Sequence, residues 1–451
     1  MKSKVEIKAY LQNNDFHKVK LAIVDIDGVL RGKVVSQEKF LSILEGGMGF
    51  CAVVFGWDME DKSYDNVQVT GWHTGYPDFD AYVDHGTMRN IPWENGLPFF
   101  LADFSDKEGN GLEVCPRSLL KRIKKQAETA GFLPRFAQEF EWFNFETTPD
   151  GFQSGISGNS KPMTPGMFGY SILRSSLKSG FFNDLFDYCQ QFDVPLEGLH
   201  TETGPGVYEA AIKYGDVLAA ADRATLFKTC TKEIAYKHGI MATFMAKWSD
   251  DLPGNGGHIH QSLWSKEGKG NLFYKDGQSI SETMMQYMAG QLFCLPYILP
   301  MVAPTINSYK RLVEGAWAPT TLTWAYDNRT TALRVLQGKE SSTRLETRVV
   351  GSDVNPYLAM SACLASGLYG IKNKLKLDQP ATVGNGYKDF SHGILPSTLQ
   401  EATTQMKTSG LAKELFGEGF VDHFCNTREW ECREFQASVT DWERKRYFEI
   451  I

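Results

Sequence analysis

Alternating apolar and polar positions predict β-strands in three stretches of the chain. Between residues 19 and 35, two apolar runs flank the turn-forming pair Asp27-Gly28, which predicts a strand, a tight turn and a second strand. Residues 136–146 are dense in aromatic side chains at a period of two, and a Gly-rich turn leads into another alternating stretch at 258–264. Successive side chains of a strand point to opposite faces, so each stretch has two faces of different chemistry.

Helical patterns lie between these strands. Three helices are predicted, at residues 37–45, 116–130 and 227–238. Ser36 is the expected N-cap of the first, and Pro116 opens the second. A further strand is predicted directly after the third helix, at 241–248.

A change in composition divides the chain. Residues 50–104 are rich in aromatic residues, glycine and aspartate, and the polar stretch 105–114 that follows is typical of a linker. We therefore expect a domain boundary near residue 108, with a small domain at 1–108 and a large one at 109–451. The mixture of strands and helices indicates the α+β class.

Length and charge exclude several kinds of function. The chain has 451 residues, enough for a large core, and a formal net charge of -7, which argues against a nucleic-acid binder. Its eight cysteines form no CxxC pair, which favours reduced thiols in the cytoplasm. The N-terminus does not resemble a signal peptide, and the most apolar run, at 292–304, contains three prolines and is too short to cross a membrane. A cytoplasmic protein without a membrane partner is expected.

Arginines are concentrated between residues 307 and 348. This stretch contains five of them: Arg311, Arg329, Arg334, Arg344 and Arg348. Glu346 lies midway between the last two, so a strand would place all three side chains on one face. Guanidinium groups suit phosphate and carboxylate, which predicts a strand beneath an anionic ligand. A solvent-exposed charged strand explains these residues about equally well when they are taken alone.

Carboxylates and histidines cluster in three other places. Glu139 and Glu141 share one face of the aromatic strand, roughly 6.5–7 Å apart, and like charges at that distance favour a bound cation. Glu202 and Glu209 flank a Gly-Pro-Gly turn. His258, His260 and Ser262 share one face of the strand that follows the Gly-rich turn. Exposure to solvent remains the alternative for Glu139 and Glu141, and a lone histidine would more often be a satisfied core residue.

Taken together, these groups predict phosphoryl transfer. Oxygen ligands with a histidine suit Mg²⁺ or Mn²⁺. Several carboxylates near several arginines fit two or more divalent ions that bridge the phosphates of a nucleotide. The sequence contains no Walker-A loop and no GxGxxG after a strand, so the nucleotide must be held in another way.

One motif suggests a different enzyme. The strand that ends in Asp25-Ile26-Asp27 is similar to the nucleophile motif of haloacid-dehalogenase-type phosphatases. That family needs a helical excursion after the motif, whereas Arg31 to Lys33 leads directly into a second strand. A β-turn rich in aspartate is the preferred interpretation.

The whole set of motifs resembles the glutamine synthetase family over nearly the full length. The resemblance lies in DIDGVLRGK, PRSLLKR, the E-F-E strand, HTETGPGVYE, the helix from Phe227, GNGGHIHQSL, NSYKRL, DNRTTALRV, RLETR and the VNPYLAMSACLASGLYG segment. It implies a small β-grasp-like domain and a catalytic domain with a curved antiparallel sheet flanked by helices. It also implies an ATP-dependent reaction in which the γ-carboxylate of glutamate is phosphorylated and then displaced by an amine.

The resemblance assigns roles to individual residues. One divalent site would use Glu141, Glu202 and Glu209, and the other Glu139, His258 and Glu346. The nucleotide would be held by His260, Ser262, Arg334 and Arg344. Glutamate would be held by Arg311, Arg348 and the backbone of Gly254, and Arg329 would stabilise the transferring phosphoryl group. Active sites shared between subunits of a homo-oligomeric ring, in some relatives a dodecamer, are also implied.

The loop at 313–319 departs from the family pattern. True glutamine synthetases carry a glutamate in a P-G-x-E-A-P arrangement here, whereas this chain has Trp317 at that position. An indole offers a broad apolar or cation–π wall to an organic amine but little to ammonium. The chain therefore resembles glutamate–amine ligases such as γ-glutamylpolyamine synthetases, with Asp58 or Glu314 as the expected base. A true glutamine synthetase and a catalytically silent structural relative remain alternatives.

Overall fold

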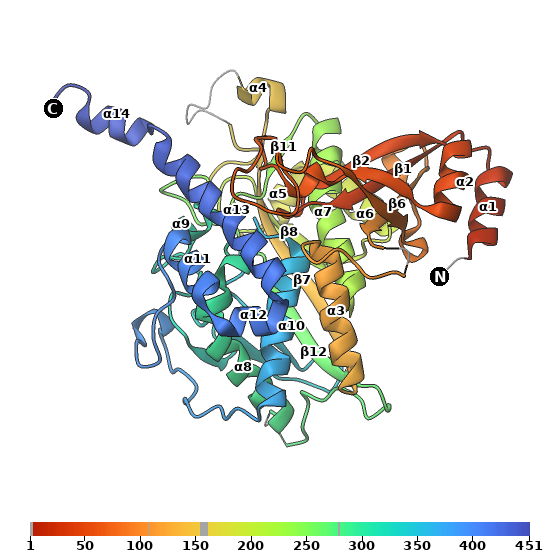
Figure 1. Cartoon of the computed structure of the whole chain (residues 1–451). Helices are drawn as coiled ribbons and strands as arrows, with labels where there is room; N and C mark the ends of the chain where they lie inside the picture. Colours follow the sequence, from red (N-terminus) through yellow and green to blue (C-terminus); the bar gives the residue numbers. More distant parts are fainter. Residues whose placement is uncertain (1–2, 107, 154–160, 278–279) are drawn as a thin grey trace.

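Two β-sheets organise the chain, and the N-terminal residues build the first (Figure 1). The computed structural model describes residues 3–106, 108–153, 161–277 and 280–451. The first sheet has six strands in the order β2-β1-β6-β4-β3, with β5 also paired to β6. Its strands are β1 Lys18–Val24, β2 Leu30–Ser36, β3 Met48–Cys51, β4 Asp78–Val83, β5 Arg89–Ile91 and β6 Leu97–Phe104.

The predicted hairpin at the start of this sheet is confirmed. Strands β1 and β2 pair antiparallel from Val24 opposite Leu30 outward. Between them, Asp25 Oδ1 accepts the backbone N–H groups of Asp27 and Val29 at 3.0 and 2.8 Å. Gly28 takes a φ of +85°, which favours glycine, and a Cβ there would lie 2.9 Å from Asn355 Cα. The turn is thus shaped to pack against the rest of the chain.

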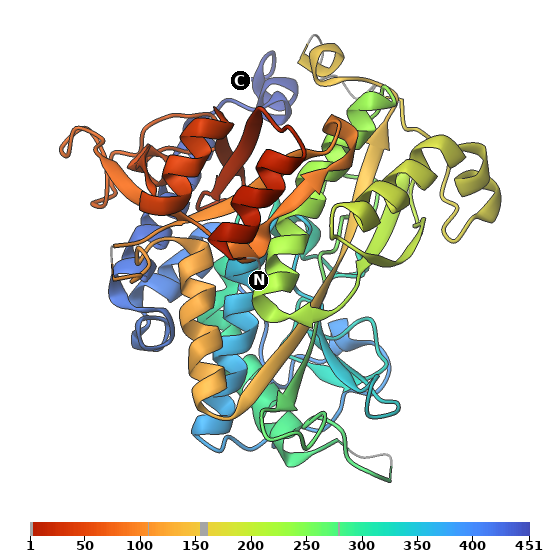
Figure 2. The same cartoon turned by 90° about the vertical axis from the view of Figure 1, so that its right-hand side faces the viewer.

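The second sheet is larger and is centred on one long strand. It has nine strands in the order β13-β14-β15-β12-β7-β9-β8, and β10 and β11 also pair with β7. Figure 2 shows β7 running across the molecule. The strands are β7 Phe132–Phe145, β8 Leu196–Thr201, β9 Val207–Ile212, β10 Gly215–Asp216, β11 Met241–Thr243, β12 Ile259–Ser265, β13 Trp324–Tyr326, β14 Leu333–Leu336 and β15 Arg344–Thr347. All pairs except β13 with β14 are antiparallel.

Helices cover one face of the second sheet and the outer side of the first. The helices are α1 Lys4–Asn13, α2 Gln37–Gly46, α3 Pro116–Thr129, α4 Pro149–Gln153, α5 Ile172–Leu177, α6 Ser179–Gln191, α7 Val217–Lys237, α8 Glu282–Ile298, α9 Ser308–Arg311, α10 Pro356–Lys372, α11 Leu399–Thr408, α12 Gly410–Phe416, α13 Glu418–Ala437 and α14 Asp441–Tyr447. Short 3-10 helices lie at Ala52–Phe55, His85–Thr87, Pro92–Glu94, Leu299–Met301 and Gly386–Lys388. Helix α14 projects from the body of the molecule near the C-terminus (Figure 1).

The two faces of β7 explain why the helices cover one side only. Phe136, Phe140 and Trp142 are all fully buried, and Phe140 stacks on Phe227 of α7 at 5.9 Å. Burying aromatic rings of this size is strongly favourable, so α7 is held against this face. The glutamates that alternate with these rings point the other way, toward a cavity.

The expected α+β architecture, with a curved antiparallel-rich sheet and flanking helices, is confirmed. The strand predicted at 241–248 was wrong beyond Thr243, because the chain there leaves β7 and turns toward the loop at 253–257. The division into domains at residue 108 stays a prediction. None of the helices in the described ranges is both long enough and apolar enough to cross a bilayer.

Candidate active site

The carboxylates predicted on separate strands converge at one cavity. Glu141 on β7 lies directly opposite Glu209 on β9, and Glu139 lies two residues before Glu141 on the same face. Glu202 follows the end of β8. A cavity of about 680 Å³ is lined by Glu139, Glu141, Tyr170, Glu202, Thr203, Val207, Glu209, Pro253, Gly254, His258, His260, Arg311, Ala316, Trp317, Arg329, Arg334, Leu336, Arg344 and Arg348.

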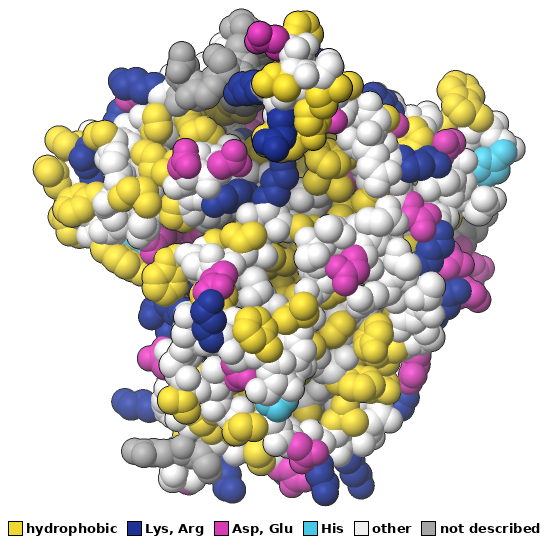
Figure 3. Space-filling model, turned by 90° about the vertical axis from the view of Figure 1, so that its left-hand side faces the viewer, with side chains coloured by type: hydrophobic (Ala, Val, Ile, Leu, Met, Phe, Trp, Pro, Cys, Tyr) yellow, Lys and Arg dark blue, Asp and Glu magenta, His cyan; other side chains and the backbone are white. Residues whose placement is uncertain are grey.

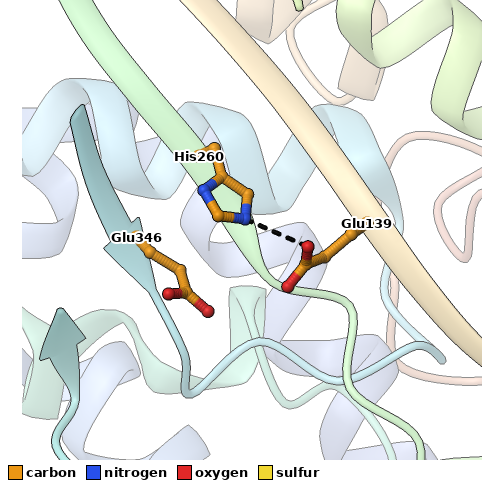
Figure 4. Close-up of side chains that lie close together, drawn as sticks. All are labelled: Glu139, His260 and Glu346. Carbon is orange, nitrogen blue, oxygen red and sulfur yellow. Dashed lines mark ion pairs between the residues drawn. The ribbon is translucent and has the colours of Figure 1, made fainter. Parts of the chain in front are cut away.

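Two histidines and a buried glutamate complete one wall. His258 Nδ1 lies 2.9 Å from Glu139 Oε1 and 3.4 Å from Glu346 Oε1, and His260 Nε2 lies 3.2 Å from Glu139 Oε2. Figure 4 shows Glu139, His260 and Glu346 pointing from three different strands toward a common space. One ligand atom from each of these three residues lies within 4.8 Å of the others.

Arginines surround Glu346 and fix its carboxylate. Arg334 Nη1 donates to Glu346 Oε2 at 2.9 Å, and Arg348 Nη1 donates to Glu346 Oε1. The side chain of Glu346 is fully buried, so both oxygens are satisfied by charged donors. The predicted alternation is confirmed for Arg344 and Glu346 in β15, and Arg348 lies just beyond the strand. The alternative of a solvent-exposed charged strand is wrong, because this face is buried beside the cavity.

A second cavity adjoins the first. It has a volume of about 310 Å³ and shares Glu139, His260 and Arg344 with the larger cavity. Arg344 Nε donates to His260 Nδ1 at 3.2 Å, so these two side chains form part of the boundary. Ser262 lines the smaller cavity and accepts a hydrogen bond from Trp264 Nε1 at 3.1 Å. The residues expected to hold a nucleotide are therefore divided between the two cavities.

Arg311 lines the larger cavity beside His258. It is fully buried, its Nη1 donates to Val349 O at 3.0 Å, and its Nη2 lies 3.4 Å from His258 Nε2. Its β-carbon and γ-carbon pack close to Gly254, where an added Cβ would lie 2.8 Å from Arg311 Cγ. The backbone at Gly254 and the Arg311 guanidinium thus border the same space.

Negative charge is concentrated around Glu209, and five arginines also line the same cavity. Burial, followed by repulsion from Glu139 and Glu141, raises the pKa of Glu209 to about 10. For Glu139, burial alone would raise the pKa, but His260 and His258 hold it well below its usual value. The pKa of His258 is lowered by burial and by Arg348. Carboxylates this close are stable together when a cation shares them.

The donor set fits a divalent metal. Carboxylate oxygens with one imidazole suit Mg²⁺ or Mn²⁺, and the raised pKa of Glu209 records the unfavourable charge that such an ion would relieve. Glu141, Glu202 and Glu209 would hold one ion. Glu139 and Glu346 would hold another with His258 or His260, because both imidazoles contact Glu139.

Two predicted residues lie away from both cavities. Asp58 Oδ2 accepts a hydrogen bond from Trp430 Nε1 at 3.0 Å, and its Oδ1 accepts two backbone N–H groups of its own turn. Glu314 is exposed and pairs with Lys388 at 2.5 Å. Neither lines the cavities, so within this chain neither is placed to act as a base.

Sequence reasoning missed Tyr170. Its ring is tilted by 38° to that of His200 at a centroid distance of 4.7 Å, and it lines the larger cavity with Glu202 and Glu209. Its backbone φ is +53°, and that of Trp317 is +57°, a conformation that bulky residues rarely adopt. No periodic pattern surrounds Tyr170, so its position depends on the hydrogen bond from its backbone N–H to Thr201 O.

The phosphatase-like motif has a structural role. Asp25 Oδ2 accepts a hydrogen bond from Arg31 Nε at 3.0 Å, and Asp27 Oδ1 accepts one from Arg428 Nη2 at 2.6 Å. Asn355 Nδ2 donates to the backbone carbonyls of Asp25 and Ile26. Both carboxylates are buried in this packing, which leaves no access for a phosphate ester.

Comparison with known proteins now identifies the family. Residues 113–447 match the family model described as glutamine synthetase, catalytic domain. The chain belongs to the glutamine synthetase family. It is 53% identical to the type-1 glutamine synthetase 2 of Dictyostelium discoideum over 96% of this chain and 84% of the relative. It is 35% identical to a glutamate–isopropylamine ligase of a Pseudomonas species over 99% of this chain and 98% of the relative.

A solved structure agrees with this family membership. The structure titled as conformation 1 of the GmaS/ADP complex matches with a TM-score of 0.82 and 27% identity, and covers 98% of this chain and 99% of that chain. The protein is therefore a carbon–nitrogen ligase of the glutamine synthetase family, whose members use ATP and divalent metals. The resemblance expected from the motifs is confirmed.

Proposed function

We propose that this ligase joins the γ-carboxylate of glutamate to an organic amine. The observation that supports the proposal is Trp317, whose side chain lines the larger cavity at the position where the family's ammonium users carry a glutamate. Without that carboxylate, ammonium loses an anionic partner, whereas an alkyl group gains an apolar wall. Tyr170 adds a second aromatic side chain to the same cavity.

The first chemical step forms γ-glutamyl phosphate. An oxygen of the γ-carboxylate attacks the γ-phosphorus of ATP, and the bond to the bridging oxygen breaks to release ADP. Arg311, Arg348 and the Gly254 backbone would orient glutamate, while His260, Ser262, Arg334 and Arg344 would hold the nucleotide. Arg329 would balance charge on the phosphoryl group during transfer. Two or more divalent ions, when bound by the six proposed ligands, would neutralise the phosphates.

The second step forms the amide. The amine must lose one proton to become nucleophilic, and its nitrogen then attacks the γ-carbonyl carbon and displaces phosphate. A second proton leaves the nitrogen as the neutral amide forms. Within this chain the carboxylates that line the larger cavity are all proposed metal ligands, and Asp58 lines neither cavity. We therefore propose Asp58 of a neighbouring subunit as the proton acceptor.

Two other functions are alternatives, and the observations favour one and count against the other. The identity of 53% to a glutamine synthetase favours ammonium as the acceptor. A silent structural relative would be expected to lose its metal ligands, whereas all six proposed ligands are present, namely Glu139, Glu141, Glu202, Glu209, His258 and Glu346.

Assembly and location form two further parts of the proposal. A homo-oligomeric ring, of up to twelve subunits, would allow Asp58 of one subunit to reach the cavity of the next. We also propose a cytoplasmic location, because all eight cysteines of the sequence are free thiols in the structure.

An amine panel with coupled ADP detection tests the proposal. Methylamine, ethylamine, ethanolamine, isopropylamine and ammonium are compared at pH 7.5 with saturating glutamate and MgATP. Trp317→Glu is expected to raise kcat/KM for ammonium about tenfold and to lower that for organic amines by a similar factor, since it replaces an apolar wall with an anion. Trp317→Phe serves as the control and should retain the preference of the parent enzyme.

Three results separate the alternatives. Organic amines preferred over ammonium support the proposal. Ammonium as the best acceptor at low concentration identifies a glutamine synthetase instead. MgATP binding without amine-stimulated ADP release identifies a silent relative.

A further inference from the structure

A hollow on the surface shares a wall with the larger cavity. It has a volume of about 550 Å³ and is lined by Trp317, Tyr326, Asp327, Asn328, Arg329, Thr330, Ala381, Thr382, Val383 and Gly384. Trp317 and Arg329 also line the larger cavity, so the two spaces meet at these side chains. A molecule that reaches the reacting centre past Trp317 would have its other end in this hollow.

Three large apolar side chains from three separate segments meet in the hollow. Trp317 is 58% exposed, Tyr326 43% and Val383 95%. Clustering of exposed apolar groups beside a cavity is typical of a ligand-binding surface. The loop 373–398 that carries Val383 runs along the left of Figure 1, and Figure 3 shows that side, where apolar side chains lie among polar ones.

Hydrogen bonds hold these segments together. Asn328 Nδ2 donates to Gly384 O at 2.7 Å, and the backbone N–H of Thr382 donates to Trp324 O at 2.9 Å. The carbonyl oxygen of Trp317 accepts a hydrogen bond from Arg348 Nη2 at 3.4 Å. The walls are therefore fixed by these hydrogen bonds before any ligand arrives.

The charges in the hollow do not favour an amine substrate that carries a second positive charge at its far end. Asp327 and Arg329 are the ionisable residues among those that line it. Arg334 Nε and Nη2 both donate to Asp327 Oδ1, at 3.0 and 2.5 Å, and this contact lowers the pKa of Asp327. Asp327 is thus already paired with one arginine, and Arg329 would repel an ammonium group nearby.

We propose that the hollow receives the uncharged, apolar end of the amine substrate. The acceptor would then be a monoamine with an alkyl or aryl body of several carbons, its nitrogen in the larger cavity and its body against Trp317, Tyr326 and Val383. This inference rests on the proposed use of an organic amine. Such a monoamine differs from a diamine, whose far end carries a charge, and from ammonium, which has no far end.

A pair of amines with equal numbers of non-hydrogen atoms tests the class of substrate. n-Hexylamine ends in a methyl group, whereas 1,5-diaminopentane places an ammonium there. For the parent enzyme, kcat/KM is expected to rise about two- to fourfold per added CH₂ from ethylamine to n-hexylamine, as apolar burial predicts. It should be at least about tenfold higher for n-hexylamine than for 1,5-diaminopentane.

A substitution in the hollow tests its location. Val383→Asp is expected to lower the ratio of kcat/KM for n-hexylamine to that for methylamine about tenfold, and to shift preference toward 1,5-diaminopentane. Val5→Asp on α1 is the matched control, because Val5 is also strongly exposed and should leave the ratio unchanged. Native mass is measured for each variant in parallel.

Several outcomes would overturn the inference while the proposed function stands. These are rates that do not depend on chain length, a preference for 1,5-diaminopentane, and an unchanged ratio in Val383→Asp. A change in native mass with Val383→Asp would assign the hollow to a subunit contact instead. Failure of every organic amine, with ammonium accepted, would instead overturn the proposed function itself.

Discussion

Two clusters of buried charge in this protein both combine carboxylates with basic side chains, but the pKa values of their carboxylates shift in opposite directions. Around Arg117, which is fully buried, Asp222 lies at 2.8 Å, Asp103 at 2.5 Å and Asp84 at 2.9 Å. The cluster joins the N-terminal sheet to helices α3 and α7. In the cavity, Glu139, Glu141 and Glu202 lie close enough to Glu209 to repel it, although five arginines line the same space.

The pKa values record this difference. Burial would raise the pKa of Asp84, but Arg117 and Lys121 lower it to about 2. In the cavity, burial and the neighbouring carboxylates raise the pKa of Glu209 to about 10. A cluster whose charges are paired within the chain stabilises the fold, whereas carboxylates that repel one another at a cavity favour a cationic ligand.

The largest effect is expected from a substitution in the carboxylate cluster of the cavity. Glu209→Gln keeps the shape of the side chain and removes its charge, so it should weaken metal binding and lower kcat by about a thousandfold or more. Without metal, the unfolding free energy of Glu209→Gln should equal or exceed that of the parent, because the parent must protonate this carboxyl in order to fold at neutral pH. ADP release and urea unfolding provide the two measurements.

Metal dependence sharpens the same test. At a hundred times its Kd, Mg²⁺ or Mn²⁺ should raise the unfolding free energy of the EDTA-treated parent protein by about 3 kcal/mol. The increase for Glu209→Gln should be clearly smaller. Equal stabilisation of both proteins would show that the ion binds elsewhere.

The next largest effect is expected from a substitution in the Arg117 cluster. Arg117→Met leaves three carboxylates without their shared partner and should lower the unfolding free energy by about 3–5 kcal/mol. Lys121→Met, whose side chain is 38% exposed and pairs with two of the same aspartates, should cost about 1 kcal/mol or less. If the two variants lost similar stability, the Arg117 cluster would not be the structural element described.

The sequence allowed much of this site to be predicted, for physical reasons. Strand periodicity placed Glu139 and Glu141 on one face, and the Gly-rich turn located His258 and His260, since both signals are local. Tyr170 was not predictable, because it reaches the cavity from an irregular segment fixed by β8. The Arg117 cluster was also missed, since its aspartates come from positions 84, 103 and 222 and share no local pattern.

A smaller effect on stability is expected from the protonation of His423, which would place a positive charge beside Arg428. His423 is buried beside Arg428, both of its ring nitrogens lack hydrogen-bond partners among the described residues, and burial lowers its pKa to about 4. The unfolded chain binds a proton near pH 6.5, so stability is fully present above that pH and is lost as pH falls toward 4. The unfolding free energy should fall by about 2 kcal/mol between pH 7 and pH 5 through this residue.

His423→Leu isolates that contribution. The variant should show a shallower loss of stability on acidification, whereas His17→Leu, which removes an exposed histidine, should follow the parent. Urea unfolding at pH 7 and pH 5 measures both. An unchanged slope in His423→Leu would mean that other groups cause the acid sensitivity.

The smallest effect is expected at Asp25, where removing the charge of the carboxyl group should change kcat and stability little. Burial and Asp27 raise the pKa of Asp25 to about 7, so its stabilising contribution is full below pH 3.8 and is lost as pH rises through 7. Asp25→Asn retains an oxygen for the N–H groups of Asp27 and Val29, and should change kcat less than twofold and stability by about 1 kcal/mol or less. A phosphatase nucleophile could not tolerate this change, so a loss of turnover above a hundredfold would restore that interpretation. Retained turnover, with a flatter dependence of stability on pH between 5 and 8, would instead show that the turn serves packing. The amide oxygen still accepts the N–H groups of Asp27 and Val29, whereas the hydrogen bond from Arg31 Nε is lost.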